Sequence, residues 1–356
     1  MVNDKTVIEY EQLGREALFG LFVKWNSHSP EALASSEDKI FSKIKKPFRR
    51  YHVDIGKCVG KNDKIWTFEM NEKSENIPIV LLHGFGAGMA FWALNLEALG
   101  TNNPVYAFDI LGLARSSRPI FSNDPAEIEE QFVLSIEKWR EAMKIDKMIL
   151  VAHSWGGFLA SSYSLKYAER VEHLLLVDPW GLDEHPDMDN FPLWKLTVAY
   201  AVRLLDGCFT MIRVFGPFGD YLIKNVRPDL LQKYNSVCEP SVFSDYIYHC
   251  VNHWQPTGEV AFHKMTRVGP WPINPVGERL KELDKNLPLT FLYGSNSWTS
   301  KAYGYILKDH RKESYTEIKI IPEAGHHLYT DNSDEFHKAV LEASQILRSN
   351  LMKKDM

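Results

Sequence analysis

The sequence predicts an α/β protein built on a doubly wound, mostly parallel sheet, and three observations support this fold class. Six short runs are rich in apolar and β-branched residues and are continuous rather than alternating, as strands buried on both faces of a parallel sheet are. Each run ends in a polar or glycine-containing turn, and helical stretches separate the runs. The predicted strands are residues 77–82, 105–110, 148–152, 174–177, 289–293 and 318–321.

One helix and one hairpin are predicted in more detail. Residues 125–143 place apolar side chains on one face, with Asp124 as the expected N-cap and a proline at the first helical position. Residues 51–57 and 64–69 flank a Gly-Lys-Asn-Asp turn and predict an antiparallel hairpin at the edge of the sheet.

The alternation of strands and helices stops between residues 180 and 287, where no strand-type run occurs and aromatic, Met and Leu residues are frequent. We expect residues 181–284 to form a helical cap that roofs an apolar pocket; additional core packing is the alternative. The core of the fold then comprises residues 51–180 and 285–356, and residues 1–50 form a separate N-terminal segment.

Composition argues against several functional classes. The chain of 356 residues has a formal net charge of −5, the wrong sign for a nucleic-acid-binding protein. No apolar run reaches the roughly 18 residues of a membrane span, and residues 1–14 lack the pattern of a signal peptide. The cysteines form no CxxC pair, and the histidines lack partners at metal-ligand spacing. We therefore expect a cytoplasmic protein without a metal or other cofactor.

The segment from Val151 to Gly157, Val-Ala-His-Ser-Trp-Gly-Gly, follows a predicted buried strand and opens a helix. A serine in this setting indicates a nucleophile elbow, a strained turn that raises the hydroxyl above the sheet and needs small residues two positions away on either side. Ala152 and Gly156 meet this need, so Ser154 is the candidate nucleophile. The alternative is an ordinary strand–loop–helix with an incidental serine.

A glycine-rich loop from His83 to Gly88 follows the first predicted parallel strand. Because an elbow lies downstream, this loop predicts an oxyanion hole made by the backbone N–H groups of Phe85 and Trp155. A phosphate-binding loop is the alternative, but the segment has neither the GK[ST] ending nor the G-x-G-x-x-G spacing of such loops.

A pair of histidines, His326 and His327, follows the last predicted strand and a glycine. A serine followed far downstream by a histidine after the final strand is the order of the α/β-hydrolase fold. The sequence therefore predicts this fold, with His326 as the general base and His327 as the less favoured candidate. An unrelated surface histidine is the alternative.

The acid of a catalytic triad is missing from its usual place. It ordinarily follows the strand at residues 289–293, but the loop at residues 294–301 contains neither Asp nor Glu. Asp178, just beyond the preceding strand, is an alternative acid, although a helix cap or turn residue explains it equally well. Loss of the acid costs a serine protease about 10⁴ in kcat, so hydrolysis is predicted to be slow unless Asp178 takes this role.

Several segments spread along the chain carry a resemblance to one family. They are Lys64–Thr67, Leu81–Gly86, Pro104–Asp109, Arg115–Pro119, Tyr163–Tyr167, Val177–Gly181, Gly216–Gly219, Tyr246–Cys250 and Gly325–His326. With them the chain resembles the α/β-hydrolase-domain subfamily of members four and five. That subfamily contains a lysophospholipase and N-acyl-phospholipid lipase, and the lipid-droplet co-activator of adipose triglyceride lipase.

The resemblance implies roles for particular residues. The hydrolase branch carries serine at the elbow, as at Ser154, whereas the vertebrate co-activator carries asparagine and does not hydrolyse. In the family's YGARSxxD loop, the acid is matched by Ser300 and the arginine by Asn296. An H-x4-D signature linked to proposed acyl transfer to lysophosphatidic acid is matched by His326 and Asp331.

Two functional hypotheses follow. The first is a lipid-metabolism protein at the lipid-droplet surface that recruits or activates a triglyceride lipase and so promotes lipolysis, with its own catalysis weakened. The sequence favours it, because two functional positions have changed together in one loop. The alternative is an active serine hydrolase (a lysophospholipase or N-acyl phospholipid lipase) or a lysophosphatidic acid acyltransferase. Both hypotheses imply a phospholipid or acyl-lipid ligand.

The N-terminal segment bears on the first hypothesis. The aromatic residues Phe19, Phe22 and Trp25 precede a basic stretch at residues 43–50. Such a segment is suited to insert its rings at a droplet or membrane surface while its cations meet anionic headgroups. A helix packed on the domain, followed by a solvated linker, is the alternative.

Overall fold

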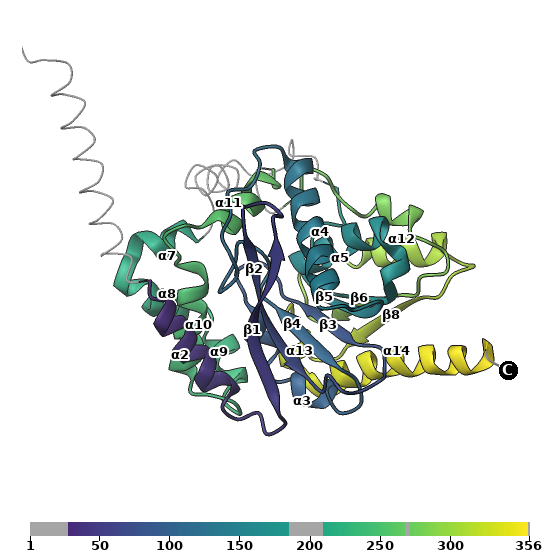
Figure 1. Cartoon of the computed structure of the whole chain (residues 1–356), viewed down its shortest axis with the longest axis horizontal. Helices are drawn as coiled ribbons and strands as arrows, with labels where there is room; N and C mark the ends of the chain where they lie inside the picture. The colour runs from purple at the N-terminus through teal and green to yellow at the C-terminus, as the bar shows by residue number, and fades with distance from the viewer. Residues whose placement is uncertain (1–27, 185–208, 268–270, 355–356) are drawn as a thin grey trace, which may run out of the picture.

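The computed structural model describes residues 28–184, 209–267 and 271–354, which contain one eight-stranded mixed sheet with helices on both faces (Figure 1). In spatial order, its strands are β1 (Phe48–Gly56), β2 (Asp63–Met70), β4 (Val105–Phe108), β3 (Ile79–Leu82), β5 (Met148–His153), β6 (Val171–Val177), β7 (Leu289–Gly294) and β8 (Thr316–Ile321). Strand β2 runs antiparallel to both of its neighbours, and β3 to β8 are parallel to one another. The predicted doubly wound, mostly parallel sheet is confirmed.

The strands lie where the sequence predicts them, with small shifts at their ends. The hairpin is confirmed, since β1 and β2 pair with Tyr51 opposite Thr67 at the edge of the sheet. The predicted strand at residues 105–110 ends earlier, at Phe108. It leaves the hydrogen-bonded ladder there because the backbone N–H of Ile110 donates to the ring of His83 (3.0 Å) rather than to a strand.

The helices are α2 (Pro30–Phe41), α3 (Leu96–Leu99), α4 (Pro125–Ala142), α5 (Trp155–Lys166), α7 (Thr210–Phe215), α8 (Gly219–Val226), α9 (Pro228–Lys233), α10 (Pro240–Val251), α11 (Thr257–Lys264), α12 (Ala302–His310), α13 (Leu328–Asp331) and α14 (Ser333–Lys354), with 3-10 turns at Met89–Trp92, Ala168–Arg170, Gly216–Phe218 and Arg279–Glu282. The predicted helix at residues 125–143 is α4. Its N-cap is Asp124, whose carboxylate accepts from the N–H groups of Ala126 (2.9 Å) and Glu127 (3.0 Å).

Alternate side chains of each central strand enter two different apolar cores. In β5, Ile149 and Val151 face a core shared with α2, α10 and α14. Leu150 and Ala152 face a second core shared with α4 and α5. Because the centre of the sheet is covered on both faces, β3, β4 and most of β5 are apolar along their length, which is the continuous pattern seen in the sequence.

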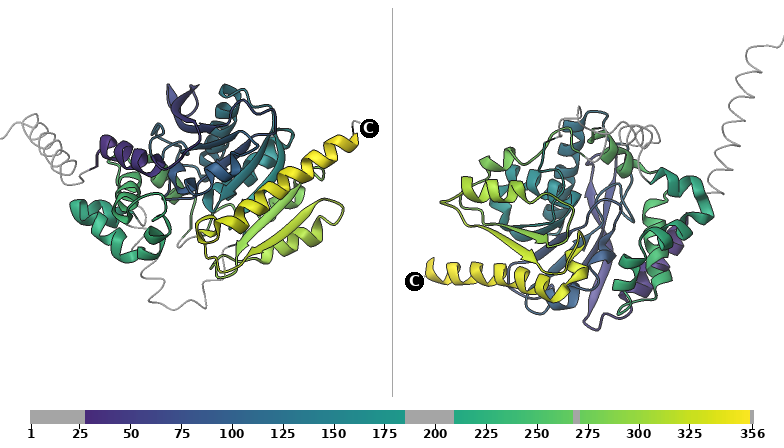
Figure 2. Two further views of the ribbon diagram at one scale, coloured as in Figure 1. Left: turned by 90° about the horizontal axis from the view of Figure 1, so that it is seen from below. Right: turned by 180° about the vertical axis from the view of Figure 1, so that it is seen from behind.

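Between β6 and β7 the chain leaves the sheet and forms a helical insertion, of which the structure describes α7 to α11. Figure 2 shows α2 and the insertion helices gathered at one side of the sheet, with α12 and α14 at the other. Residues 185–208 and 268–270 of the predicted cap lie outside the described residues.

The described part of the N-terminal segment packs on the domain. Helix α2 lies against α10, and its Glu37 is fully buried. The Glu37 carboxylate accepts hydrogen bonds from Arg50 (2.6 Å), Arg115 (2.7 Å) and the indole N–H of Trp66 (3.0 Å). These contacts join the segment to the β1–β2 hairpin, because Arg50 and Trp66 belong to those strands.

Other sequence expectations are tested only in part. The aromatic residues of the predicted anchor, Phe19, Phe22 and Trp25, lie outside the described residues. Across residues 28–184, 209–267 and 271–354, no helix has both the length and the apolar character needed to span a bilayer. The same part of the chain holds no group of three or more His, Cys, Asp or Glu side chains arranged for a metal ion.

Candidate active site

Ser154 lies in the tight turn between β5 and α5. Its backbone has φ +54° and ψ −120°, a conformation that residues other than glycine rarely adopt. Two backbone hydrogen bonds hold the turn: the Ser154 N–H donates to the Val177 carbonyl (3.0 Å), and the Trp180 N–H donates to the Ser154 carbonyl (3.1 Å). This is the local geometry that a nucleophile elbow requires.

Two glycines let the elbow approach the loop at residues 83–88. A Cβ at Gly156 would lie 2.4 Å from the carbonyl oxygen of His83. A Cβ at Gly84 would lie 2.9 Å from Nδ1 of His153 and 3.0 Å from the Cβ of Ser154. A larger residue at either position would therefore push the glycine-rich loop away from the serine.

His326 connects Ser154 to a carboxylate. Its Nε2 lies 3.0 Å from the Ser154 hydroxyl, and its Nδ1 lies 2.6 Å from Oδ2 of Asp178. When Nδ1 carries the proton and donates to Asp178, Nε2 is free to accept the proton of the serine hydroxyl. The Asp178 side chain is 0% exposed and the His326 side chain 16% exposed, so water has limited access to their hydrogen bond.

Asp178 can reach His326 because of where β6 lies in the sheet. It follows Val177, the last residue of β6, which pairs with His153 at the end of β5. Its backbone has φ +45°, and its N–H donates to the carbonyl of Leu292 in β7 (2.7 Å). The structure thus brings the three sequence candidates Ser154, His326 and Asp178 together, with the carboxylate on the strand next to the nucleophile.

The loop after β7 supplies hydroxyl groups rather than a carboxylate. Both Ser297 and Thr299 donate through their hydroxyls to Oδ2 of Asp178, and the Gly294 N–H lies 3.4 Å from Oδ1. These donors compensate the buried charge for its lost hydration. Sequence reasoning missed Ser297 and Thr299; the available signal was a hydroxyl-rich Ser-Asn-Ser-Trp-Thr-Ser stretch where an acid is usual.

The two residues that depart from the family pattern have other contacts. Ser300 hydrogen-bonds the side chain of Asp183, a half-buried carboxyl whose pKa is raised by burial. The backbone N–H of Asn296 donates to the Ala324 carbonyl (2.8 Å). The position of the family's usual acid is therefore occupied by a residue that serves a different carboxyl group.

The loop that carries one expected oxyanion donor, the Phe85 N–H, packs against the elbow that carries the other, the Trp155 N–H. The ring of Phe85 lies edge-on to that of Trp155, with 6.0 Å between centroids. Burial lowers the pKa of His83 to about 4, so its ring is neutral. Its Nδ1–H donates to the carbonyl of Gly84 (2.8 Å) while its Nε2 accepts from Ile110. These contacts fix the loop that carries the Phe85 N–H.

Two further histidines adjoin His326. Burial, with a smaller contribution from the charge of His326, lowers the pKa of His153 well below its usual value. The neutral His153 donates from Nε2 to the carbonyl of His326 (2.9 Å) and so anchors the histidine loop. Burial and the charges of His326 and Arg227 likewise lower the pKa of His327, which lines the pocket beside the serine.

Asp331, the acid of the H-x4-D pattern, binds the backbone of the loop that carries His326. Its Oδ2 accepts from the Gly325 N–H (2.6 Å), and its Oδ1 pairs with Lys233 at the end of α9. The Asp331 side chain is nearly buried. Its carboxylate is therefore committed to joining the loop of His326 to the helical insertion.

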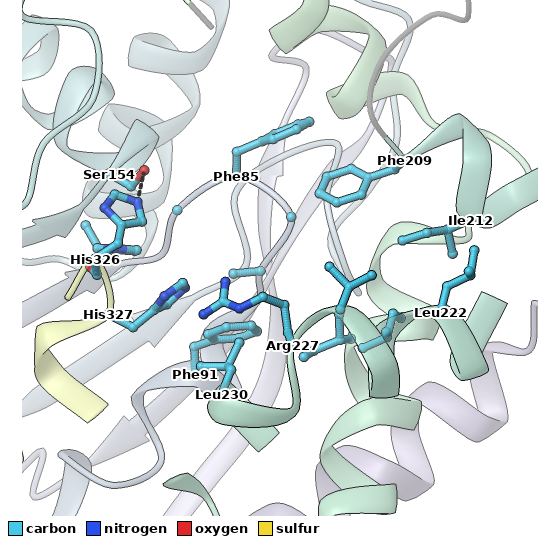
Figure 3. A pocket seen from close by; sticks show the side chains of 17 residues that line it. Phe85, Phe91, Ser154, Phe209, Ile212, Leu222, Arg227, Leu230, His326 and His327 are labelled. Atoms are coloured by element: carbon cyan, nitrogen blue, oxygen red, sulfur yellow. Dashed lines mark hydrogen bonds between the residues drawn. The ribbon is translucent and has the colours of Figure 1, made fainter. Parts of the chain in front are cut away.

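A cavity of about 400 Å³ opens beside Ser154 and His326 (Figure 3). The glycine-rich loop forms one part of its wall and α7 to α10 form another, which agrees with the expectation of an apolar pocket under a cap. Figure 3 shows Phe85, Phe209 and Ile212 following one another away from the serine. The lining residues are Gly84, Phe85, Gly86, Ala87, Phe91, His153, Ser154, Phe209, Ile212, Leu222, Ile223, Val226, Arg227, Leu230, Ile247, His326 and His327.

Comparison with known proteins identifies the family. Residues 77–333 match the family model described as the alpha/beta hydrolase fold. The chain belongs to the α/β-hydrolase family. Solved structures with a similar fold align with it: the carboxylesterase CesB of Bacillus subtilis has a TM-score of 0.59 at 16% identity, covering 88% of this chain and 96% of the other. A membrane phospholipase A, a bacterial virulence factor, has a TM-score of 0.61 at 17% identity, covering 96% and 97%.

Among α/β hydrolases, two kinds of relative are similar to the chain to nearly the same degree. The first is the 1-acylglycerol-3-phosphate O-acyltransferase ABHD5 of Mus musculus, 41% identical over 319 residues, which cover 88% of this chain and 89% of the relative. The second is the (lyso)-N-acylphosphatidylethanolamine lipase of Mus musculus, 40% identical over 319 residues, which cover 88% and 92%. The resemblance stated from the sequence is confirmed at this level, and the chain is a lipid-metabolism α/β hydrolase.

The first prediction tests Asp178 as the acid. We expect Asp178→Asn to slow the labelling of Ser154 by a fluorophosphonate probe by about 10⁴, because His326 then loses the partner that holds its proton on Nδ1. The matched control is Asp183→Asn, which removes the carboxyl bonded by Ser300 and should change labelling by less than about threefold. Equal labelling rates of Asp178→Asn and the unaltered chain would exclude Asp178 from this role.

Proposed function

We propose that the chain is a serine hydrolase that cleaves the acyl ester of lysophospholipids or N-acyl phospholipids. The observation that carries the proposal is the continuous hydrogen-bonded path from Asp178 through His326 to Ser154, at the wall of a largely apolar cavity. An acyl chain fits an apolar cavity of this size, and the ester then lies beside the hydroxyl.

The reaction follows from the positions of these groups. Ser154 Oγ attacks the ester carbonyl carbon while Nε2 of His326 takes the hydroxyl proton, and Asp178 stabilises the imidazolium that forms. The carbonyl oxygen gains negative charge and accepts from the backbone N–H groups of Phe85 and Trp155. The C–O bond to the leaving alcohol breaks as His326 donates its proton to that oxygen. Water, activated by His326, then hydrolyses the acyl-enzyme.

The same acyl-enzyme allows acyl transfer as an alternative outcome. If the hydroxyl of lysophosphatidic acid replaces water, His326 removes its proton and the acyl group passes to that oxygen. The similarity to ABHD5, a 1-acylglycerol-3-phosphate O-acyltransferase, favours this alternative. In this proposal Asp331 acts through the loop at Gly325 rather than on the substrate, because its carboxylate binds that backbone and Lys233.

The sequence alone favoured weakened catalysis, and the reason was the missing acid after β7. The carboxylate of Asp178 lies within hydrogen-bond distance of His326, which removes that reason and supports the hydrolase instead. The hydroxyls of Ser297 and Thr299 add support, because they hold the carboxylate in a position that serves the histidine.

The second prediction concerns hydrolysis. The purified chain should release fatty acid from a lysophospholipid, and Ser154→Ala should reduce kcat by about 10⁵ or more, because removal of the nucleophile leaves only binding and oxyanion stabilisation. The control is Ser300→Ala, which should keep kcat within about threefold. Turnover that persists in Ser154→Ala, or no fluorophosphonate labelling of Ser154, would contradict the proposal.

A second candidate function is activation of a triglyceride lipase at a lipid-droplet surface. It is favoured by the similarity to ABHD5, since the subfamily resemblance implies this role for its co-activator branch. Such a role needs surface binding rather than Ser154 chemistry, so it is compatible with an active hydrolase.

The third prediction addresses that candidate. A chain lacking residues 1–27 should fold, because α2 and its Glu37 contacts remain, yet should lose binding to triglyceride droplets coated with anionic phospholipid. The Ser154→Ala variant should bind as the full chain does and should still raise the activity of an added triglyceride lipase. Undiminished droplet binding by the truncated chain would contradict the anchor, and failure of Ser154→Ala to activate would tie activation to catalysis.

A further inference from the structure

Arg227 is a permanent cation in a pocket whose other described lining residues are apolar apart from Ser154 and three histidines. It lies between α8 and α9, where its N–H donates to the carbonyl of Ile223 (3.0 Å). Figure 3 shows its guanidinium group directed toward His327, on the side of the cavity away from Phe85.

The guanidinium of Arg227 has a partner that leaves it able to bind an anion. Its Nε and Nη2 lie 3.2 and 3.1 Å from the carboxylate of Asp229, and Nη1 has no hydrogen-bond partner among the described residues. The two side chains are 42% and 55% exposed, so water screens their attraction. A phosphate group inside the cavity would be less hydrated than the exposed Asp229 carboxylate and could accept two parallel N–H bonds from the guanidinium. Such a bidentate contact is stronger than the screened pair with Asp229.

The surroundings of Arg227 favour an anion over a second apolar group. His327, its neighbour in the cavity, stays neutral because burial and the nearby positive charges lower its pKa, so it adds a polar ring without competing for the anion. The acyl chain has a separate wall, formed by Phe85, Phe209 and Ile212. The cavity therefore has an apolar wall that begins at Phe85 and, beyond His327, a single charged side chain among its described lining residues, that of Arg227.

We propose that Arg227 binds the phosphate of a single-chain lysophospholipid and so determines specificity for anionic over neutral acylglycerols. The placement of the ester at Ser154 rests on the proposed hydrolase function, whereas the phosphate contact itself does not require catalysis. With the carbonyl at the serine, the glycerophosphate extends past His327 to Arg227, and the acyl chain extends along the apolar wall. A monoacylglycerol with the same chain makes every contact except that with the guanidinium.

Binding to a Ser154→Ala background tests this without turnover. Calorimetry compares three ligands: a lysophosphatidic acid and the monoacylglycerol with the same acyl chain, both below their critical micelle concentrations, and inorganic phosphate. We expect Arg227→Gln to raise the Kd of lysophosphatidic acid by about tenfold or more, because its charged hydrogen bonds are lost. The Kd of the monoacylglycerol should change by less than about twofold. Arg227→Lys should retain part of the affinity as a point charge.

The matched control is Lys224→Gln, which removes one positive charge from the same segment. Lys224 is 41% exposed, pairs with Asp220 on α8 and does not line the cavity. The Lys224→Gln variant should bind both lipids with unchanged affinity.

An equal loss of affinity for both lipids in Arg227→Gln would indicate a structural role and overturn the proposal. Unchanged affinity for lysophosphatidic acid would overturn it as well. Tight, Arg227-dependent binding of inorganic phosphate with no effect on the lipid would show a free-anion site instead. If the unaltered chain hydrolyses no lysolipid but these binding results hold, the hydrolase proposal fails and the phosphate contact stands.

Discussion

The active-site arrangement depends on one buried negative charge, the carboxylate of Asp178. A carboxylate removed from water is strongly destabilising unless hydrogen bonds replace its hydration. Here His326 and the hydroxyls of Ser297 and Thr299 provide them. Because these groups come from the loops after β7 and β8, the charge ties together the ends of three adjacent strands. The histidine is held in one orientation by the same bonds, and Ser154 on β5 lies within its reach.

The helical insertion is joined to this arrangement through the loop of His326. Asp331 accepts from the backbone of Gly325 and pairs with Lys233 on α9, so one side chain contacts both the histidine loop and the cap. The insertion also supplies Phe209 and Ile212 of the apolar wall, and Arg227 lies at the junction of α8 and α9. In the proposed function, the chemistry therefore takes place at the strand ends, and the insertion selects the ligand.

Sequence patterns predicted the features that depend on local order. Continuous apolar runs identified the parallel strands, Asp124 and Pro125 marked the start of α4, and the small residues around Ser154 marked the elbow. For Asp178, the sequence left two interpretations open, the acid of the triad and a helix cap or turn residue. Its position beside His326 depends on the pairing of β6 with β5 and on a backbone with φ +45°. The support from Ser297 and Thr299 could not be predicted, since which side chains meet across strand ends is set by the tertiary structure.

The most direct test of the hydrogen bond between His326 and Asp178 is ¹H NMR of the low-field region, where a histidine Nδ1 proton shared with a carboxylate is observed. We expect one such resonance in the unaltered chain, retained in Ser154→Ala and Ser300→Ala and absent from both His326→Ala and Asp178→Asn. The partner that holds the proton is then Asp178. Persistence of the resonance in Asp178→Asn would show that another group holds the His326 proton and would contradict the account.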